Sequence, residues 1–482
     1  VIGEAVPGST LTGATVLLSL VIAAVVALPQ DAWLVLLRAY WATPLREIDP
    51  YLGRDMAFWM AWLPLERSLH AWSVLLAVVV GFTVLMLYAL TPSLRVDRGH
   101  LHVSTRARRH FAAYTAILLL LVARGYRLDA FDLFIHGSGV RESFVAFDHL
   151  VLFPYLVSTG IGTAAAALLV AWTGWMGQQR AMLGTLLLVV VAGPAGRAVL
   201  PLFNRQVERD GERSVLDRPY LRVRALYTRR AYQLDDVLRG AAADRVRVDT
   251  ARLGVSVPGW DPVTLARALA DDPGVEAVAG ATTWRVTREG QLRAGVLLGT
   301  ATSDVSRAPL ALREADPTDA DDRGAPWPVS DALTVAVPPL SVGLGLRPAL
   351  PILDSLGGVA APPFTSGWRR VAMAWGVRNL RLAAVEANDR RTKLLVRRDV
   401  GERVQALLPF FTVGATPQAL VVGDSLWWVL ELFNASEDYP FAEPLVLGGV
   451  AQRYASSAGV ALLNAHSGRV RVVLPPRGDR VT

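Results

Sequence analysis

The chain has 482 residues, of which 52% are hydrophobic and 19% charged, and 49 basic against 42 acidic residues give a net charge of +7. A charged fraction below the roughly 25% typical of soluble domains fits a chain that lies partly in lipid, where each charge is costly. The absence of cysteine excludes disulfides, thiolate catalysis, cysteine-ligated zinc and iron–sulfur clusters.

Nearly all long apolar runs lie before residue 203. A helix that crosses a ~30 Å hydrocarbon core needs about 20 mostly apolar residues. Five stretches predict such helices: 10–29, 71–91, 110–123 with its continuation, 149–173 and 181–202. The first lacks the basic leader of a signal peptide, so we interpret it as a membrane helix. The shorter segment 31–41 carries Trp33, Tyr40 and Trp41 and predicts an interfacial helix.

Basic residues in the short loops predict the orientation of these helices. Loop 92–109 contains five arginines and the single acid Asp97, so we place it in the cytoplasm, against anionic lipid headgroups. The five are Arg95, Arg98, Arg106, Arg108 and Arg109. Five alternating helices then put everything after residue 203 outside. The sequence therefore predicts a protein of the bacterial inner (cytoplasmic) membrane with its C-terminal domain on the extracytoplasmic side.

The predicted fold class is a membrane α-helical bundle of about five transmembrane helices plus an extracytoplasmic α+β domain. The bundle covers 1–203, with an interfacial element at 31–69. A basic connector without an apolar run follows at 204–245, and the outer domain covers 246–482. These ranges divide the chain where its hydropathy and charge change.

Within the outer domain, alternating apolar residues around turn sequences predict three hairpins. The turns are at Glu289-Gly290, Gly423-Asp424 and Ser467-Gly468, and the second hairpin would place Trp427 and Trp428 on opposite faces. Residues 263–280 predict a helix, a turn and a strand. An acidic stretch rich in glycine and proline, 311–330, predicts a surface loop. Further helices are expected at 367–387 and 399–408.

Four stretches resemble segments of the uncharacterised protein family 0182, whose members are large bacterial integral membrane proteins. They are DPYLGRDMAFWMAWLPLERSL (49–69), ARGYRLDAFDLFIHGSGV (123–140), DRPYLRVRALYTRRAYQLDDV (217–237) and the region 394–443. The residues between about 246 and 345 show little of the family pattern, and family members are usually much longer. The resemblance implies a multi-pass membrane protein with an extracytoplasmic domain, and it implies no activity.

Arg54 and Asp55 lie among aromatic residues in the segment 51–67, which also contains Glu66 and Arg67. One interpretation is a re-entrant element that lines a site. The interpretation we favour is an interface helix in which each acid pairs with the arginine beside it. In the outer domain, Asp389, Glu437 and Asp438 match no calcium-loop spacing and are expected to be exposed loop acids.

Gly160 and Gly162 belong to a Gly-Ile-Gly-Thr-Ala-Ala sequence whose residue pattern matches a dinucleotide-binding fingerprint, although its predicted structural context does not. The motif lies in the middle of a predicted membrane helix, where small residues favour close helix packing. Arg197 is a charge within a predicted span and follows Gly193-Pro194-Ala195-Gly196. It is either a functional intramembrane charge at a discontinuous helix or a side chain that snorkels to the outer interface.

We find no catalytic, cofactor-binding or metal-binding residues in the sequence, and no cofactor or nucleic acid is expected. The predicted function is that of a non-catalytic integral membrane protein, a structural or accessory subunit of a larger membrane complex. Its partners would be the lipid bilayer and other membrane proteins. Two alternatives stay open: a transporter or transport-associated protein, and an envelope enzyme with its site in the outer domain.

Overall fold

The structure is a computed structural model that forms two compact units. Unit 1 comprises Val1–Asp235, Ser436–Leu445 and Gln452–Tyr454, and unit 2 comprises Asp236–Ala435, Val446–Ala451 and Ala455–Thr482. The residues described are 32–89, 94–97, 100–209, 213–235, 275–277, 283–286, 290, 292–300, 310–320, 326–328, 335–337, 349–353, 361–364, 367–384, 392–423, 425–447 and 449–474, with isolated positions between 12 and 23.

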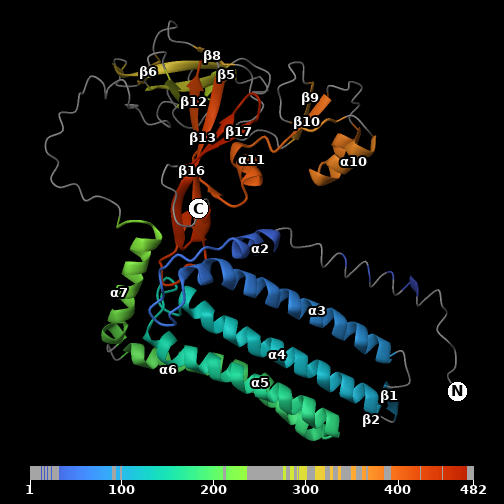
Figure 1. Ribbon diagram of the computed structural model, residues 1–482. Helices are drawn as coiled ribbons and strands as arrows, with labels where there is room; N and C mark the ends of the chain where they lie inside the picture. The colour runs from blue at the N-terminus through green and yellow to red at the C-terminus, as the bar shows by residue number, and fades with distance from the viewer. Residues whose placement is uncertain are drawn as a thin grey trace. The chain divides into compact units, whose positions relative to one another are not determined.

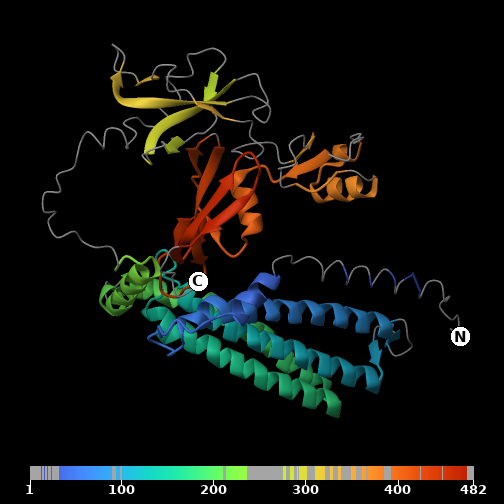
Figure 2. The ribbon, with the colours of Figure 1, turned by 45° about the horizontal axis from the view of Figure 1, so that its top comes forward.

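Unit 1 is built on long helices that lie side by side (Figures 1 and 2). In chain order they are α2 (Ala32–Tyr40), a π-helical turn η1 (Phe58–Trp62) that leads into α3 (Leu63–Ala89), α4 (Thr105–Ile135), a second π-helical turn η2 (Asp148–Leu152) that leads into α5 (Phe153–Met176), α6 (Gln179–Arg209) and α7 (Arg213–Ala231). Among the described residues, three helices are long and apolar enough to cross a membrane: Phe58–Tyr88, Thr105–Ile135 and Asp148–Met176.

The predicted spans 71–91, 110–123 and 149–173 fall on these three helices. The predicted span 181–202 lies in α6, whose described apolar part, Gln179–Val191, is shorter than a membrane span. The span predicted at 10–29 lies outside the described residues except at isolated positions. A bundle of about five spans therefore stays a prediction, while three helices of spanning length are established.

The ends of α4 and α5 carry the capping groups that their sequences supply. The Ser104 hydroxyl accepts the backbone N–H of Ala107 at 3.2 Å at the start of α4. Gly177, in the left-handed region with φ 86°, ends α5. The Arg108 guanidinium donates to the Gly174 carbonyl at 3.3 Å, which links the two helix ends.

The predicted basic loop contains an antiparallel hairpin, β1 (Leu94–Asp97) with β2 (His100–Val103). Arg95 lies in β1, Arg98 lies outside the described residues, and Arg106 is exposed in the first turn of α4. The Arg109 guanidinium lies 4.5 Å from the centre of the Trp175 ring. Contact of these arginines with anionic headgroups stays a prediction.

Tyrosines of one helix pack against glycines of another throughout the bundle. A Cβ atom at Gly81 of α3 would overlap the Tyr114 ring of α4, and one at Gly193 of α6 would overlap the Tyr126 hydroxyl. A Cβ atom at Gly196 of α6 would likewise overlap the Tyr155 ring of α5. These glycines let aromatic rings reach the backbone of a neighbouring helix.

The discontinuous helix considered at Gly193-Pro194-Ala195-Gly196 is not found, because α6 runs without a break from Gln179 to Arg209. A proline removes one helical hydrogen bond, and α6 accommodates this loss. The Tyr155 hydroxyl donates to the Gly193 carbonyl at 2.6 Å. The small residues of this segment therefore serve contact with α5 rather than a helix break.

The helices of unit 1 expose large apolar side chains along much of their length. The most exposed on α3, α5 and α6 are Leu76, Val78, Phe82, Leu87, Ile161, Leu168, Trp172, Leu183, Leu187, Leu188 and Val190. Soluble monomers rarely expose apolar bands of this extent. These surfaces require cover by lipid or by protein.

Unit 2 is organised around one large sheet with the strand order β17-β16-β13-β12-β4-β5-β6-β7. The strands are β4 (Thr283–Val286), β5 (Leu292–Thr300), β6 (Leu310–Ala320), β7 (Pro326–Pro328), β12 (Gln418–Val422), β13 (Ser425–Ser436), β16 (Tyr454–Asn464) and β17 (Val470–Val473). β3 (Val275–Ala277), β8 (Val335–Val337) and β11 (Thr412–Val413) pair at its flanks, and β14 (Leu445–Leu447) pairs separately with β15 (Val450–Gln452). β12 and β4 are parallel, which joins two antiparallel halves.

The three predicted hairpins are confirmed as β4–β5, β12–β13 and β16–β17. Their turn glycines, Gly290, Gly423 and Gly468, have φ values of 79°, 60° and 69°, in the left-handed region that glycine adopts without strain. Trp428 is fully buried and Trp427 is only partly buried, as the alternation of β13 predicts. Strand periodicity thus placed this part of the core correctly.

Two predicted elements of unit 2 are wrong. Residues 311–330 are not a loop: β6 and β7 occupy most of this range, because the backbone of β6 completes ladders with β5 and β8 whatever its side chains. The helix predicted at 367–387 is interrupted, since α10 (Gly367–Gly376) ends before Arg378, with φ 54°, and a 3₁₀ turn η4 (Leu380–Ala384) follows. The helix predicted at 399–408 is confirmed as α11 (Val400–Leu407).

A smaller part of unit 2 is formed by α10, η4 and the antiparallel pair β9 (Ala349–Leu353) and β10 (Thr392–Val396). In Figures 1 and 2, α10 lies beside these two strands. Its core consists of Phe364, Ala374, Leu382 and Leu394, all buried. The strand predicted within 263–280 is present as β3, and the helix predicted before it lies outside the described residues.

Candidate functional site at the helix junction

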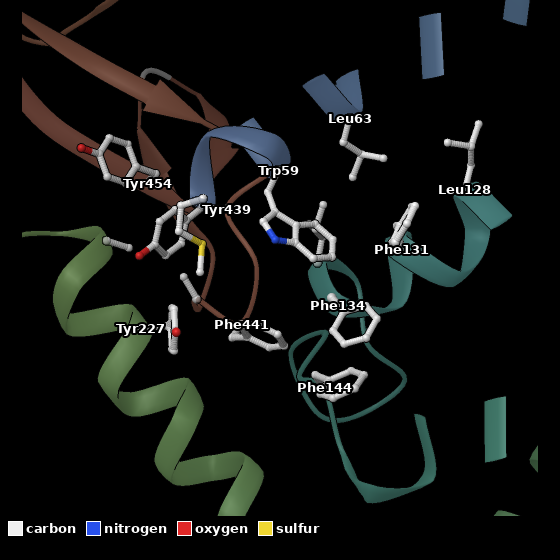
Figure 3. Packing of buried hydrophobic residues seen from close by; sticks show 14 residues of the cluster. Trp59, Leu63, Leu128, Phe131, Phe134, Phe144, Tyr227, Tyr439, Phe441 and Tyr454 are labelled. Carbon is white, nitrogen blue, oxygen red and sulfur yellow. The ribbon is translucent and has the colours of Figure 1, made fainter. Parts of the chain in front are cut away.

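A large buried core of unit 1 lies where the helices meet the C-terminal segments 436–445 and 452–454. We call this region the junction and define it by the unit 1 residues of 44–67, 128–149, 217–232, 436–445 and 452–454. Its aromatic core joins Trp59, Phe134, Phe144, Tyr227, Tyr439 and Phe441 (Figure 3). Met56 and Tyr454, which are 398 residues apart in sequence (454 − 56), therefore share one core.

Asp49 organises the loop that enters η1. Its carboxylate is buried and accepts three backbone N–H groups, from Tyr51 at 3.0 Å, Leu52 at 2.6 Å and Arg54 at 2.7 Å. Gly53 takes a φ of 66° within this turn. A buried carboxylate that accepts three N–H groups fixes a loop in one conformation. This loop is a rigid element of the junction.

Asp55 continues the same arrangement. Its carboxylate accepts the backbone N–H groups of Leu45 at 3.0 Å, Arg46 at 2.8 Å and Ala57 at 2.8 Å. Asp55 thus binds the loop backbone on both sides of itself, just before η1 begins.

Arg54 and Asp55 do not form the neighbouring ion pair that the sequence suggested. The Arg54 guanidinium lies over the Phe58 ring, with Cζ 4.3 Å from the ring centre. Glu66 likewise pairs with Arg127, at 2.9 Å, instead of with Arg67. The reason is geometric, because adjacent residues of a helix or turn point in different directions.

Arg67 connects three segments of unit 1. Its guanidinium binds Asp132 of α4 at 2.7 Å and Asp438 of the C-terminal segment at 2.6 Å. His136 approaches the same Asp132 carboxylate at 3.1 Å. Burial raises the pKa of Asp438, and the Arg67 charge opposes this rise only in part. Asp438 is therefore not the exposed loop acid predicted from the sequence, whereas its neighbour Glu437 is exposed.

A second charged group joins the entry loop to α7. Glu47 accepts from Arg230 at 2.9 Å and from the Tyr439 hydroxyl at 3.2 Å. The Tyr227 hydroxyl donates to the Ile48 carbonyl at 3.0 Å. Burial raises the pKa of Tyr227 and of Tyr439, with the Glu47 charge adding to both shifts.

Arg453 holds the end of the C-terminal segment. Its guanidinium donates to the Ala442 carbonyl at 2.6 Å and pairs with Glu142. The Tyr232 hydroxyl lies 2.7 Å from the Glu443 carbonyl and 2.8 Å from the Gln452 carbonyl, and burial raises the Tyr232 pKa to about 12. These contacts bind segments 436–445 and 452–454 to loop 136–147 and to α7.

The loop after α4 is bound by two acids. The fully buried Asp148 accepts the N–H groups of Ser138 and Val145, each at 3.0 Å. Asp217 of α7 accepts the N–H of Ala146, also at 3.0 Å. The acids of the junction thus repeatedly accept backbone N–H groups of loops, which is a structural use of buried charge.

The predicted glycines occupy different environments on α5. A Cβ at Gly160 would lie 3.3 Å from the Ala123 carbonyl and 3.4 Å from the Tyr126 Cβ, both on α4. At Gly162 a Cβ would meet nothing within 4 Å among the described residues. Arg197 lies in α6, and its side chain is outside what the structure describes.

The polar contacts of the junction hold the helices, loops and C-terminal segments of unit 1 together. Most of its charged groups contact backbone amides, backbone carbonyls or opposite charges, and Arg54 lies over an aromatic ring. The part of the chain that is described contains no group of three or more His, Asp or Glu side chains suited to a metal ion. Sequence reasoning missed Asp49, Arg67 and Arg453 as members of one site. The one sequence signal for this site was the family resemblance, because each family-like segment contributes residues to the junction. These segments are 49–69, 123–140, 217–237 and 394–443.

Apolar helices of spanning length, a charged and aromatic junction and a separate sheet-containing unit define a membrane-associated protein with a folded C-terminal unit. The model of the uncharacterised protein family UPF0182 matches residues 4–253 and 354–473, and the chain belongs to this family. The unmatched stretch between them contains β3 to β9, in agreement with the weak family pattern expected over much of it.

The relatives are long bacterial proteins. The chain is 25% identical to a UPF0182 protein of Moorella thermoacetica, over 94% of this chain and 55% of the relative. It is 24% identical to one of Cupriavidus necator, over 91% and 54%, and 25% identical to one of Synechococcus sp., over 91% and 60%. The chain thus spans about half the length of the curated relatives that it matches. No solved structure matches.

Proposed function

We propose that the chain is a non-catalytic integral membrane protein that serves as a structural or accessory subunit of a larger membrane complex. In this proposal its helices cross a bacterial inner membrane, and unit 2 forms an interaction domain on the extracytoplasmic side. The observation that carries the proposal is the junction, in which charged side chains join helices, loops and the C-terminal segment into one core.

The use of charge in the junction supports a structural role. Arg67 bridges two carboxylates, and Asp49 and Asp55 each accept three backbone N–H groups. A carboxylate that accepts three backbone N–H groups uses most of its roughly four acceptor sites to hold the loop. A core that joins helices, loops and the C-terminal segments of unit 1 supports a scaffold role for this unit.

The exposed apolar faces support the need for partners. Leu168, Leu187 and Leu188 are all more than 60% exposed. Lipid can cover these side chains, and so can helices of another protein, because both surroundings are apolar.

The test is extraction of the tagged chain from its native membrane in a mild detergent, followed by quantitative mass spectrometry. An unrelated tagged membrane protein of similar abundance is processed in parallel as the control. We expect a fixed set of proteins in stoichiometric amounts with the chain and not with the control. Recovery of the chain alone, or only as a homo-oligomer, would contradict the accessory role.

A further inference from the structure

Helix α10 carries an exposed apolar stripe in addition to the face that it buries. Trp368 is 80% exposed, Trp375 is 74% exposed and Val371 is 48% exposed. Their spacing of three and four residues places them on one side of the helix. Ala374 and the partly buried Met373 and Val377 pack into the core with Phe364 and Leu394. The two tryptophans of the stripe are therefore mostly uncovered in the described structure.

The segment that contains α10 and η4 is basic in sequence. Residues 361–385 contain four arginines and no acid. Arg369, Arg378 and Arg381 are exposed, and Arg370 is partly buried. A short helix with two tryptophans on its outer face and arginines around them has the composition of elements that lie at the surface of anionic membranes.

We propose that α10 docks unit 2 onto the surface of an anionic lipid bilayer. The indole rings of Trp368 and Trp375 would enter the headgroup region, and the exposed arginines would contact lipid phosphates. The inference rests on the proposed function, in which unit 1 lies in the bilayer. Because unit 2 is covalently joined to those helices, the effective concentration of the bilayer around α10 is high and a small apolar stripe suffices.

Charge complementarity favours lipid over a protein partner for this face. A leaflet rich in anionic lipid presents a continuous negative surface to exposed arginines such as Arg378 and Arg381 at once. A protein partner would need acids placed to match each arginine around a pocket for two indoles. That arrangement is the other outcome of the experiment below.

The experiment uses the full chain in proteoliposomes, with a single cysteine and an environment-sensitive fluorophore. The chain has no cysteine of its own, so each variant carries one label. Ala372→Cys places the label on exposed α10, next to the stripe. Val80→Cys labels the exposed apolar face of α3, and Thr416→Cys labels an exposed loop of unit 2. Nitroxide-labelled lipid is the quencher, in vesicles with or without phosphatidylglycerol.

We expect nitroxide lipid to quench the labels at residues 80 and 372, and to leave the label at 416 bright. Quenching at 372 should be stronger with phosphatidylglycerol and weaker in high salt. If the label at residue 80 is quenched but the label at residue 372 stays unquenched in both types of vesicle, the docking proposal is overturned and membrane insertion stands. If the label at 80 is not quenched, the proposed function itself fails. Protection of residue 372 from aqueous quencher in native membranes but not in proteoliposomes would assign the face to a protein partner and overturn lipid docking.

Two variants test the chemistry of the contact. Trp368→Ser with Trp375→Ser should abolish quenching at residue 372, and the exposure of both side chains predicts little change in thermal stability. Arg378→Gln and Arg381→Gln should each lower the ratio of docked to free α10 about fivefold at low salt. Unchanged quenching in the tryptophan variant would contradict docking through this stripe.

Discussion

The two units of this protein differ in how their side chains meet. All eleven tyrosines lie in unit 1, and unit 2 contains none. The main core of unit 2 consists of aliphatic residues and Trp428. The core of the junction contains Tyr227, Tyr439 and Tyr454 together with phenylalanines and Trp59. Both units are stably packed in the structure, but they use different chemistry.

The difference reflects what each core must connect. A sheet satisfies its own backbone groups, so the side chains of its core need only fill space. The junction joins helix ends and loops, whose backbone groups need side-chain partners. Tyrosine offers an apolar ring and a hydroxyl at once, and Tyr227 and Tyr232 both bond loop carbonyls. Carboxylates such as Asp49 serve the loop N–H groups in the same way.

The largest effect is expected in the core of unit 2. Trp428→Ala should destabilise unit 2 by about 3–5 kcal/mol, because it removes a fully buried indole and leaves a cavity. Trp427→Ala, on the other face of the same strand, is the matched control and should cost much less. Chemical denaturation followed by circular dichroism measures both. Equal losses would contradict the assignment of the two faces.

Asp49→Ala tests how far the stability of unit 1 depends on polar groups. It leaves three backbone N–H groups of the entry loop without their acceptor, and we expect a loss of about 2–4 kcal/mol. Glu437→Ala removes an exposed carboxylate from the same unit and should change stability by less than about 0.5 kcal/mol. Thermal unfolding in detergent distinguishes the two. A small effect of Asp49→Ala would show that the loop does not rely on its carboxylate.

Arg67→Gln should cost about 1–2 kcal/mol, because it leaves Asp132 and Asp438 without their shared cation in a half-buried site. Adding Asp438→Asn to this variant should recover part of the loss, since it removes one unpaired charge. A double-mutant cycle measures the coupling. Strict additivity of the two single changes would show that the bridge contributes no energy.

Alkaline pH should weaken unit 1 and spare unit 2. Burial raises the pKa of Tyr51 and of Tyr232 to about 12 and also raises that of Tyr439. A raised pKa means that the folded state favours the neutral phenol, so this stability is complete below the unfolded value of about 10 and is lost as pH rises towards 12. Each tyrosine should contribute about 1 kcal/mol after allowance for solvent screening. Tyrosinate absorbance and tryptophan fluorescence, recorded together, follow the transition, and Tyr51→Phe should reduce it.

The smallest effect compares two glycines of α5. Gly162→Ala should stabilise the helix by up to about 1 kcal/mol, because alanine favours helices and the site is open. Gly160→Ala places its Cβ within 3.4 Å of α4 and should gain less or lose stability. Thermal unfolding of the two variants in the same detergent gives the difference. A larger gain at Gly160 would contradict the close approach of α4 and α5.

The sequence predicted those parts of the molecule whose structure follows from a single hydrophobic pattern, either strand alternation or a long apolar run. The alternation of side chains between the two strand faces in 418–432 predicted the hairpin and the burial of Trp428. The length of the apolar runs predicted the three long helices. The junction could not be predicted in this way, because Arg67, Asp132 and Asp438 are far apart in the chain and no local sequence pattern links them. The strand β6 was missed because pairing with β5 decided its conformation against its acidic, proline-containing sequence.

The central claim is that unit 1 lies in the bilayer and unit 2 outside it, and single-cysteine accessibility tests this most directly. Thr105→Cys marks the start of α4 beside the basic hairpin, Val80→Cys marks the apolar face of α3, and Thr416→Cys marks unit 2. The reagent is a membrane-impermeant maleimide, applied to spheroplasts before and after lysis. We predict labelling of residue 416 in intact spheroplasts, of residue 105 only after lysis, and of residue 80 only in detergent. Labelling of 105 but not 416 in intact spheroplasts would reverse the topology, and labelling of residue 80 without detergent would remove α3 from the bilayer.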